Sequence, residues 1–115
     1  MTSTERAALQ PEDGKLVTLA RATRARTGAT EGAALRDLDG RTYAAATVDL
    51  PSLKLSALEV CIAMAIASGS RGAEAAVVLG DGAEVSLEAL RDFAGDGVPV
   101  HHGAPNGTIA GTLAT

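Results

Sequence analysis

The chain has 115 residues, of which 46% are hydrophobic, but its only aromatic residues are Tyr43 and Phe93, and its formal net charge at pH 7 is −4. A chain of this length is expected to fold as one domain around a single core. The negative charge and the scarcity of rings disfavour nucleic-acid binding, because phosphates attract basic side chains and unpaired bases stack on aromatic ones.

The N-terminal residues and the cysteine content favour a cytoplasmic location. Residues 1–10 have neither the basic start nor the apolar segment of a secretion signal, so we expect a flexible N-terminus there and one folded domain over residues 11–115. Cys61 is the single cysteine and cannot form an intrachain disulfide, which suits a reducing compartment. The longest apolar run is shorter than the about 20 residues that cross a bilayer, so we expect no membrane partner.

The first elements in chain order are a helix and a hairpin. A helix is predicted over about 11–26, because a proline followed by two acidic residues suits a first helical turn. The pair Asp39-Gly40 is typical of a two-residue turn and lies between predicted strands at about 32–38 and 41–48. We expect Pro51 to break the second strand.

The stretch 57–67 is predicted to form the central helix of the domain. Every residue in it except Glu59 is apolar, so this helix should be buried on all sides. Ser56 and Glu59 have the spacing of a capping box, in which each side chain accepts a hydrogen bond from the other residue's backbone amide. Gly69 is expected to end the helix.

The remaining chain adds strands and one more helix. Residues 74–79 form a short apolar run typical of a buried strand, and 86–93 have helical spacing, with Ser86 as the expected N-cap. A further strand is predicted at 98–102, and 108–113 could be a short strand or a tail. This order predicts an α/β fold: a three-layer α/β/α domain around a mixed sheet of four to five strands.

Three short segments resemble the cytidine deaminase family, and the similarity covers roughly residues 14–102. They look like its first strand, its hairpin and its substrate-binding strand, and they read Gly32-Ala33-Ala34-Leu35, Asp39-Gly40-Arg41 and Val48-Asp49. In that family a His or Cys two residues before a Glu opens the central helix, and a Pro-Cys-x-x-Cys segment opens the next one. The two motifs hold a zinc ion that activates water, while the Glu transfers protons.

The first of these motifs is degenerate in this chain. It falls at Ser56-Ala57-Leu58, where Ser56 stands at the position of the zinc ligand and Leu58 at that of the acid. A shift of one residue brings Glu59 to the acid position but Ala57 to the ligand position. Neither alignment supplies both groups, and the capping box accounts for Ser56 and Glu59 without a metal.

The second motif is absent, because the expected segment 79–87 contains neither Pro nor Cys. Catalytic zinc generally needs three protein ligands. His101 and His102 are neighbours on a predicted strand, so their side chains should point to opposite faces of the sheet. A set that combines these histidines with Asp49 or Glu59 remains an open alternative.

The substrate pocket implied by the resemblance is altered as well. Ala29 stands where the family has a Phe that holds the base, and Thr47 and Asp49 stand where an Asn and a Glu bind the ribose. Of these three remnants only Asp49 keeps the chemical character of the family residue. We therefore expect no intact nucleoside site.

The sequence thus predicts a non-catalytic homologue of the cytidine deaminases, with no metal and no cofactor, that acts as a structural or protein-binding domain. Since that family assembles into dimers and tetramers, the resemblance also implies a homo-oligomer. Two alternatives stay open. One is an active cytidine or deoxycytidine deaminase, or a related hydrolase, with an atypical zinc site. The other is a nucleoside-binding module without turnover.

Overall fold

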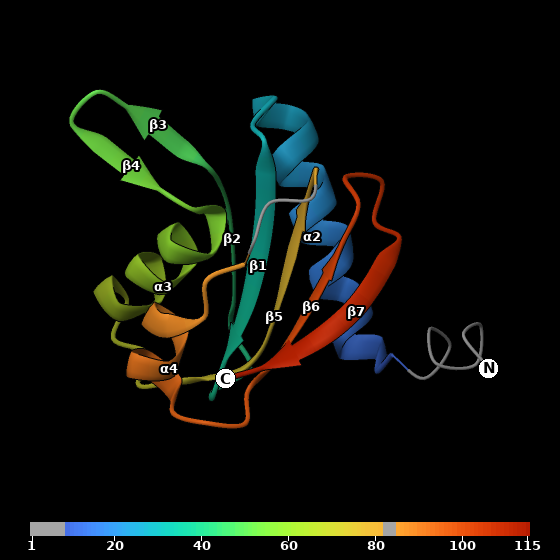
Figure 1. Ribbon diagram of the computed structural model, residues 1–115. Helices are drawn as coiled ribbons and strands as arrows, with labels where there is room; N and C mark the ends of the chain where they lie inside the picture. Colours follow the sequence, from blue (N-terminus) through green and yellow to red (C-terminus); the bar gives the residue numbers. More distant parts are fainter. Residues whose placement is uncertain (1–8, 82–84) are drawn as a thin grey trace.

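The structure is a computed structural model that describes residues 9–81 and 85–115. A mixed sheet of five strands forms the middle layer, with one helix against one face and two helices against the other (Figure 1). The predicted three-layer α/β/α fold is therefore confirmed. Most of the predicted flexible N-terminus, residues 1–8, lies outside the described residues. None of the described helices is long and apolar enough to cross a membrane.

The sheet contains one parallel pair of strands among antiparallel neighbours. Only β5 and β6 run parallel, and the chain between them contains a helix on one face of the sheet. The segment 108–113, predicted as a strand or a tail, forms most of the edge strand β7. In spatial order the strands are β2 (Thr42–Ala46), β1 (Glu31–Asp37), β5 (Ala73–Gly80), β6 (Pro99–Gly103) and β7 (Ile109–Ala114).

Two apolar cores form, one on each face of the sheet. Helix α2 (Pro11–Thr27) packs on one face through Leu16 and Ala20, against aliphatic side chains of β1 and β5. Helices α3 (Ala57–Ala67) and α4 (Glu88–Ala94) cover the other face. At Gly32 the helix α2 comes so close that a Cβ would lie 2.3 Å from the carbonyl oxygen of Ala20, so only glycine fits there.

The prediction that α3 is buried on all sides is wrong. The sheet occupies the centre of the domain, and α3 belongs to an outer layer, so only the side of α3 that faces the sheet is covered. On the outer side, Met64 is 39% exposed and Ile66 is 55% exposed, and Ala63 and Ala67 are exposed as well. Helix α3 therefore presents an apolar outer surface.

The chain between β2 and α3 contains a second hairpin that the sequence analysis missed. Strand β3 (Val48–Leu50) pairs antiparallel with β4 (Leu53–Leu55), and Pro51 lies in the turn between them. Proline suits this position because its fixed φ matches the first central residue of a common β-turn. The hairpin projects beyond the sheet next to the amino end of α3 (Figure 1).

The start of α4 also differs from the prediction. Its N-cap is Leu87, which makes no capping hydrogen bond through its side chain, and Ser86 precedes the cap. The helix is short and depends on its packing instead, because Leu90 is fully buried against the same core as α3. The packing of Leu90 in the core, and not a capping hydrogen bond from Ser86, therefore determines where this helix begins.

Candidate functional site

The amino end of α3 is closed by the predicted capping box. The Ser56 hydroxyl accepts a hydrogen bond from the backbone N–H of Glu59 at 3.1 Å, and the Glu59 carboxylate accepts one from the backbone N–H of Ser56 at 2.8 Å. Both side chains thus bind backbone amides that the helix itself leaves unpaired. Neither is directed to another side chain by a hydrogen bond in the part of the chain that the structure describes.

Leu58 lies at the position that the resemblance assigns to the proton-transferring acid. It is only 2% exposed and packs in the core between α3 and the sheet. A side chain in this place is surrounded by apolar groups and cannot reach a bound molecule. The residue therefore serves the packing of the helix.

A third group at this helix end, Glu31, was not identified from the sequence. Glu31 begins β1 and is half-buried, and its Oε1 accepts a hydrogen bond from the backbone N–H of Ala57 at 3.3 Å. A carboxylate is stabilised there because the helix dipole is positive at its amino end. The one available signal was a charged residue directly before the apolar run of β1.

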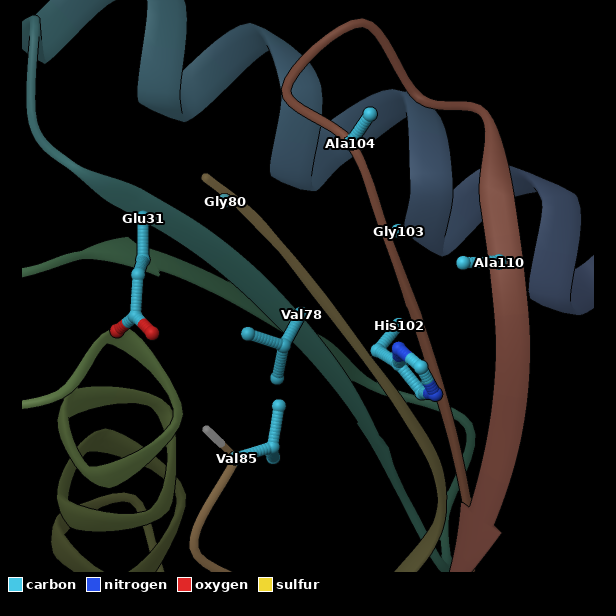
Figure 2. A pocket seen from close by; sticks show the side chains of 8 residues that line it. All are labelled: Glu31, Val78, Gly80, Val85, His102, Gly103, Ala104 and Ala110. Carbon is cyan, nitrogen blue, oxygen red and sulfur yellow. The ribbon is translucent and has the colours of Figure 1, made fainter. Parts of the chain in front are cut away.

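Glu31 also lines a cavity on the face of the sheet that α3 and α4 cover. The cavity has a volume of about 260 Å³ and lies at the carboxyl ends of the parallel strands β5 and β6, a common place for ligands in α/β proteins. Figure 2 shows the carboxylate of Glu31 and the imidazole of His102 on opposite sides of it. Its lining residues are Glu31, Val78, Gly80, Val85, His102, Gly103, Ala104 and Ala110.

Two glycines make room for the two polar side chains of this cavity. A Cβ at Gly111 would lie 3.0 Å from the imidazole Nε2 of His102, its cross-strand neighbour. A Cβ at Gly80 would lie 3.1 Å from Cγ of Glu31, which it pairs with across β1 and β5. The cavity thus offers a carboxylate acceptor and an imidazole that can donate or accept.

The three predicted pocket remnants do not line this cavity. Ala29 is half-buried between α2 and β1. The Thr47 hydroxyl accepts a hydrogen bond from the backbone N–H of Glu31 at 2.9 Å and so helps to hold the start of β1. Asp49 is exposed on the hairpin and forms an ion pair with Lys54 at 2.6 Å.

His101 points to the other face of the sheet, as its position next to His102 predicts. Its Nε2 lies 2.8 Å from Oδ2 of Asp13 on α2, and its Nδ1 lies 2.8 Å from the hydroxyl of Thr112. Arg36 Nη2 lies 2.9 Å from the second oxygen of Asp13, as an ion pair without hydrogen-bond alignment. This polar group joins α2 to the sheet, and the alternation of side chains along β6 places His102 on the opposite face.

The most strongly perturbed carboxylate, Asp37, has a structural role. Burial would raise its pKa, but hydrogen bonds from Ser70 and from the backbone amides of Arg41 and Asp39, together with the Arg41 charge, lower it to about 2. These bonds fix the turn between β1 and β2 and tie it to Ser70, three residues beyond the end of α3. The shift therefore reports the fold and not a catalytic group.

The donor set at the amino end of α3 does not fit a catalytic zinc ion. It consists of the carboxylates of Glu31 and Glu59 and the hydroxyl of Ser56, each engaged with a backbone amide, whereas zinc prefers nitrogen and sulfur ligands. Burial raises the pKa of the Cys61 thiol to about 12, and this thiol lies in the core, with its Sγ 3.5 Å from the carbonyl oxygen of Tyr43. Across residues 9–81 and 85–115, no three His, Cys, Asp or Glu side chains lie close enough to hold a metal.

Comparison with known proteins places this geometry in a family. The chain matches the family model described as cytidine deaminase-like over residues 9–107. No curated protein is significantly similar to it in sequence. Among solved structures, it is similar to a cytidine deaminase from Mycobacterium leprae, with a TM-score of 0.67 and 22% identity over 87% of this chain and 90% of that one. A cytidine deaminase from Burkholderia pseudomallei gives a TM-score of 0.69 and 22% identity over 88% and 89%.

Proposed function

Because this chain belongs to the cytidine deaminase-like family, we propose that it is a metal-free, non-catalytic member that acts in the cytoplasm as an oligomeric structural or protein-binding domain. The observation that carries this proposal is the amino end of α3. Ser56, Glu59 and Glu31 satisfy backbone amides there, and none of them is a nitrogen or sulfur ligand. A metal-activated water would have no ligand set to hold its metal in that place.

The second helix of the family's zinc site supports the same proposal. The segment 79–87, which leads into α4, has no Cys and no His in its sequence. The first residues of α4, Glu88 and Ala89, follow an N-cap leucine. Neither helix that would contribute ligands therefore has a Cys or His at its N-cap or in its first turn.

The apolar outer surface of α3 supports the oligomeric part of the proposal. Met64 and Ile66 lie on it, and Leu50 and Leu53 of the neighbouring hairpin are 56% and 48% exposed. Large apolar side chains that gather at the surface usually mark an interaction site. A second copy of the chain is the expected partner because the same surface on both copies can form a symmetric, self-complementary contact.

The enzymatic part of the proposal is tested by incubation with zinc and substrate. The purified chain, with and without added zinc, is mixed with cytidine or deoxycytidine, and the release of ammonia is measured. We expect no release above the rate of a heat-denatured sample. Turnover that depends on added zinc would overturn the proposal and favour an active deaminase with an atypical metal site.

The cavity between Glu31 and His102 favours a second candidate, a ligand-binding module without turnover. Its volume of about 260 Å³ is below the roughly 300–1,000 Å³ typical of sites for drug-sized ligands, so it suits the base of a nucleoside better than the whole molecule. Thermal shift with a panel of nucleosides and free bases tests this. A shift that is lost in His102→Ala would support the binding function, since a bound ligand stabilises the folded state.

A further inference from the structure

Among residues 9–81 and 85–115, strand β7 forms one of the two edges of the sheet. It pairs with β6 on one side, and Figure 1 shows it as the outermost strand. The strand at the opposite edge, β2, is contacted by both α2 and α3. Within the part of the chain that the structure describes, β7 is also the more exposed of the two edge strands, since four of its six residues are exposed and only one of the five in β2 is. Strand β7 consists of Ile109–Ala114.

The hydrogen-bond phase of β7 determines which backbone groups point outward. The N–H of Thr115 donates to the carbonyl of Val98 at 3.1 Å, so these two residues form a hydrogen-bonded pair. Because the two kinds of pair alternate, the next pair, Pro99 and Ala114, is a non-hydrogen-bonded one. The N–H and C=O of Ala114 then point away from β6. Because the pattern alternates along the strand, those of Thr112 point outward as well.

This edge lacks the charged residues that usually protect an exposed strand. Residues 97–115 contain no Asp, Glu, Lys or Arg, although the whole chain has 24 of them, 10 basic and 14 acidic. Natural edge strands commonly carry charges that prevent pairing with another chain. Leu113, between the two outward-pointing residues, is 39% exposed and would be covered by a second strand.

We propose that β7 pairs antiparallel with β7 of a second copy of this chain, so that two sheets join into one. One register pairs every outward-pointing N–H and C=O of Thr112 and Ala114. In it, Thr112 lies opposite Ala114 of the second copy, and the two copies of Leu113 lie opposite each other. Each copy supplies two N–H donors and two C=O acceptors. A second copy fits because this register is self-complementary and brings together no like charges, despite the net charge of −4.

This interface is separate from the α3 surface and does not depend on the proposed function. Residue-resolved hydrogen exchange by NMR, at several protein concentrations, tests it together with light-scattering mass. We expect the amides of Thr112 and Ala114 to be protected when the chain is dimeric and to lose protection on dilution. Exchange at the rate of unbonded amides at every concentration would overturn the proposal, and so would protection that dilution does not change.

A charged variant with a matched control separates this contact from others. Leu113→Lys places two like charges opposite each other and should weaken dimerisation by about tenfold or more, with the loss of protection at Thr112 and Ala114. Leu19→Lys makes the same chemical change at a side chain of similar exposure on α2, 37% exposed, and should leave that protection unchanged. If Leu113→Lys dimerises and protects both amides as the parent chain does, the proposal is wrong.

Discussion

The carboxylate of Glu31, at the start of β1, accepts a hydrogen bond from the backbone N–H of Ala57, the first residue of α3, at 3.3 Å. A negative side chain therefore lies at the helix end where the family resemblance expects a positive metal ion. The positive end of the helix dipole stabilises an anion placed next to it, and here the carboxylate of Glu31 is that anion. The hydrogen bond between Glu31 and Ala57 therefore holds α3 against β1 and supports the proposal that no metal-dependent catalysis takes place there.

Removal of the Glu31 carboxylate should weaken the attachment of α3 to β1. Glu31→Ala removes both the charge and the hydrogen bond at the helix end, so we expect the free energy of unfolding to fall by about 1 kcal/mol. Urea denaturation at pH 7 measures it. Glu31→Gln keeps an acceptor without the charge and should lose less, and equal losses in the two variants would show that the charge alone matters.

The capping box makes a second prediction at the same helix end. Ser56→Ala removes the acceptor for the backbone N–H of Glu59, so we expect a loss of about 0.5–2 kcal/mol of stability. The matched control is Ser86→Ala, because Ser86 lies outside the N-cap of α4 and should cost almost nothing. Equal urea midpoints for Ser56→Ala and the parent chain would contradict the capping role.

Asp37 should make the domain sensitive to acid. Its pKa in the folded state is about 2, below the ordinary value of 3.8, so the ionised carboxylate stabilises the fold above about pH 4, and this contribution is lost as the pH falls toward 2. Asp37→Asn should lower the urea midpoint at pH 7 and reduce its dependence on pH between 4 and 2. An unchanged acid dependence in the variant would assign the effect to other carboxylates.

The outer surface of α3 should control self-association. Ile66→Lys adds a charge to a residue that is 55% exposed, so we expect the contact through α3 to be lost and the light-scattering mass to fall toward that of the dimer joined through β7. The melting temperature of the dilute chain should change little. Leu19→Lys is the control, since Leu19 is a 37% exposed apolar residue on α2, across the sheet. If the light-scattering mass is the same in both variants as in the parent chain, α3 is not part of an interface between copies.

Local signals in the sequence predicted local structure well. The Ser56 capping box depends on residues within three positions and is present. A hairpin turn also forms at Asp39-Gly40, but its loop has three residues, 38–40, instead of the predicted two. The N–H of Asp37 donates to the carbonyl of Arg41, the N–H of Gly40 donates to the carbonyl of Asp37, and Gly40 takes a positive φ of 84°. The same reasoning treated Pro51 as the end of a strand, although it begins the turn of a hairpin. Proline fits both roles, and only the pairing of β3 with β4 distinguishes them.

Long-range relationships could not be obtained in this way. Glu31 and Ala57 are 26 residues apart, and His102 meets Gly111 only through the pairing of β6 with β7, so no spacing rule identifies the cavity. Similarly, the apolar composition of α3 shows which residues avoid water but not what covers them. The sheet covers one side of α3, and the sequence alone does not indicate an outer surface.

The central claim is that the amino end of α3 cannot hold a zinc ion. Its most direct test is elemental analysis of the full chain, expressed with added zinc and purified without chelator. We predict a zinc content far below one ion per chain, unchanged in Ser56→Ala. One tightly bound zinc per chain that resists dialysis, and that Ser56→Ala or Glu59→Ala removes, would contradict the account.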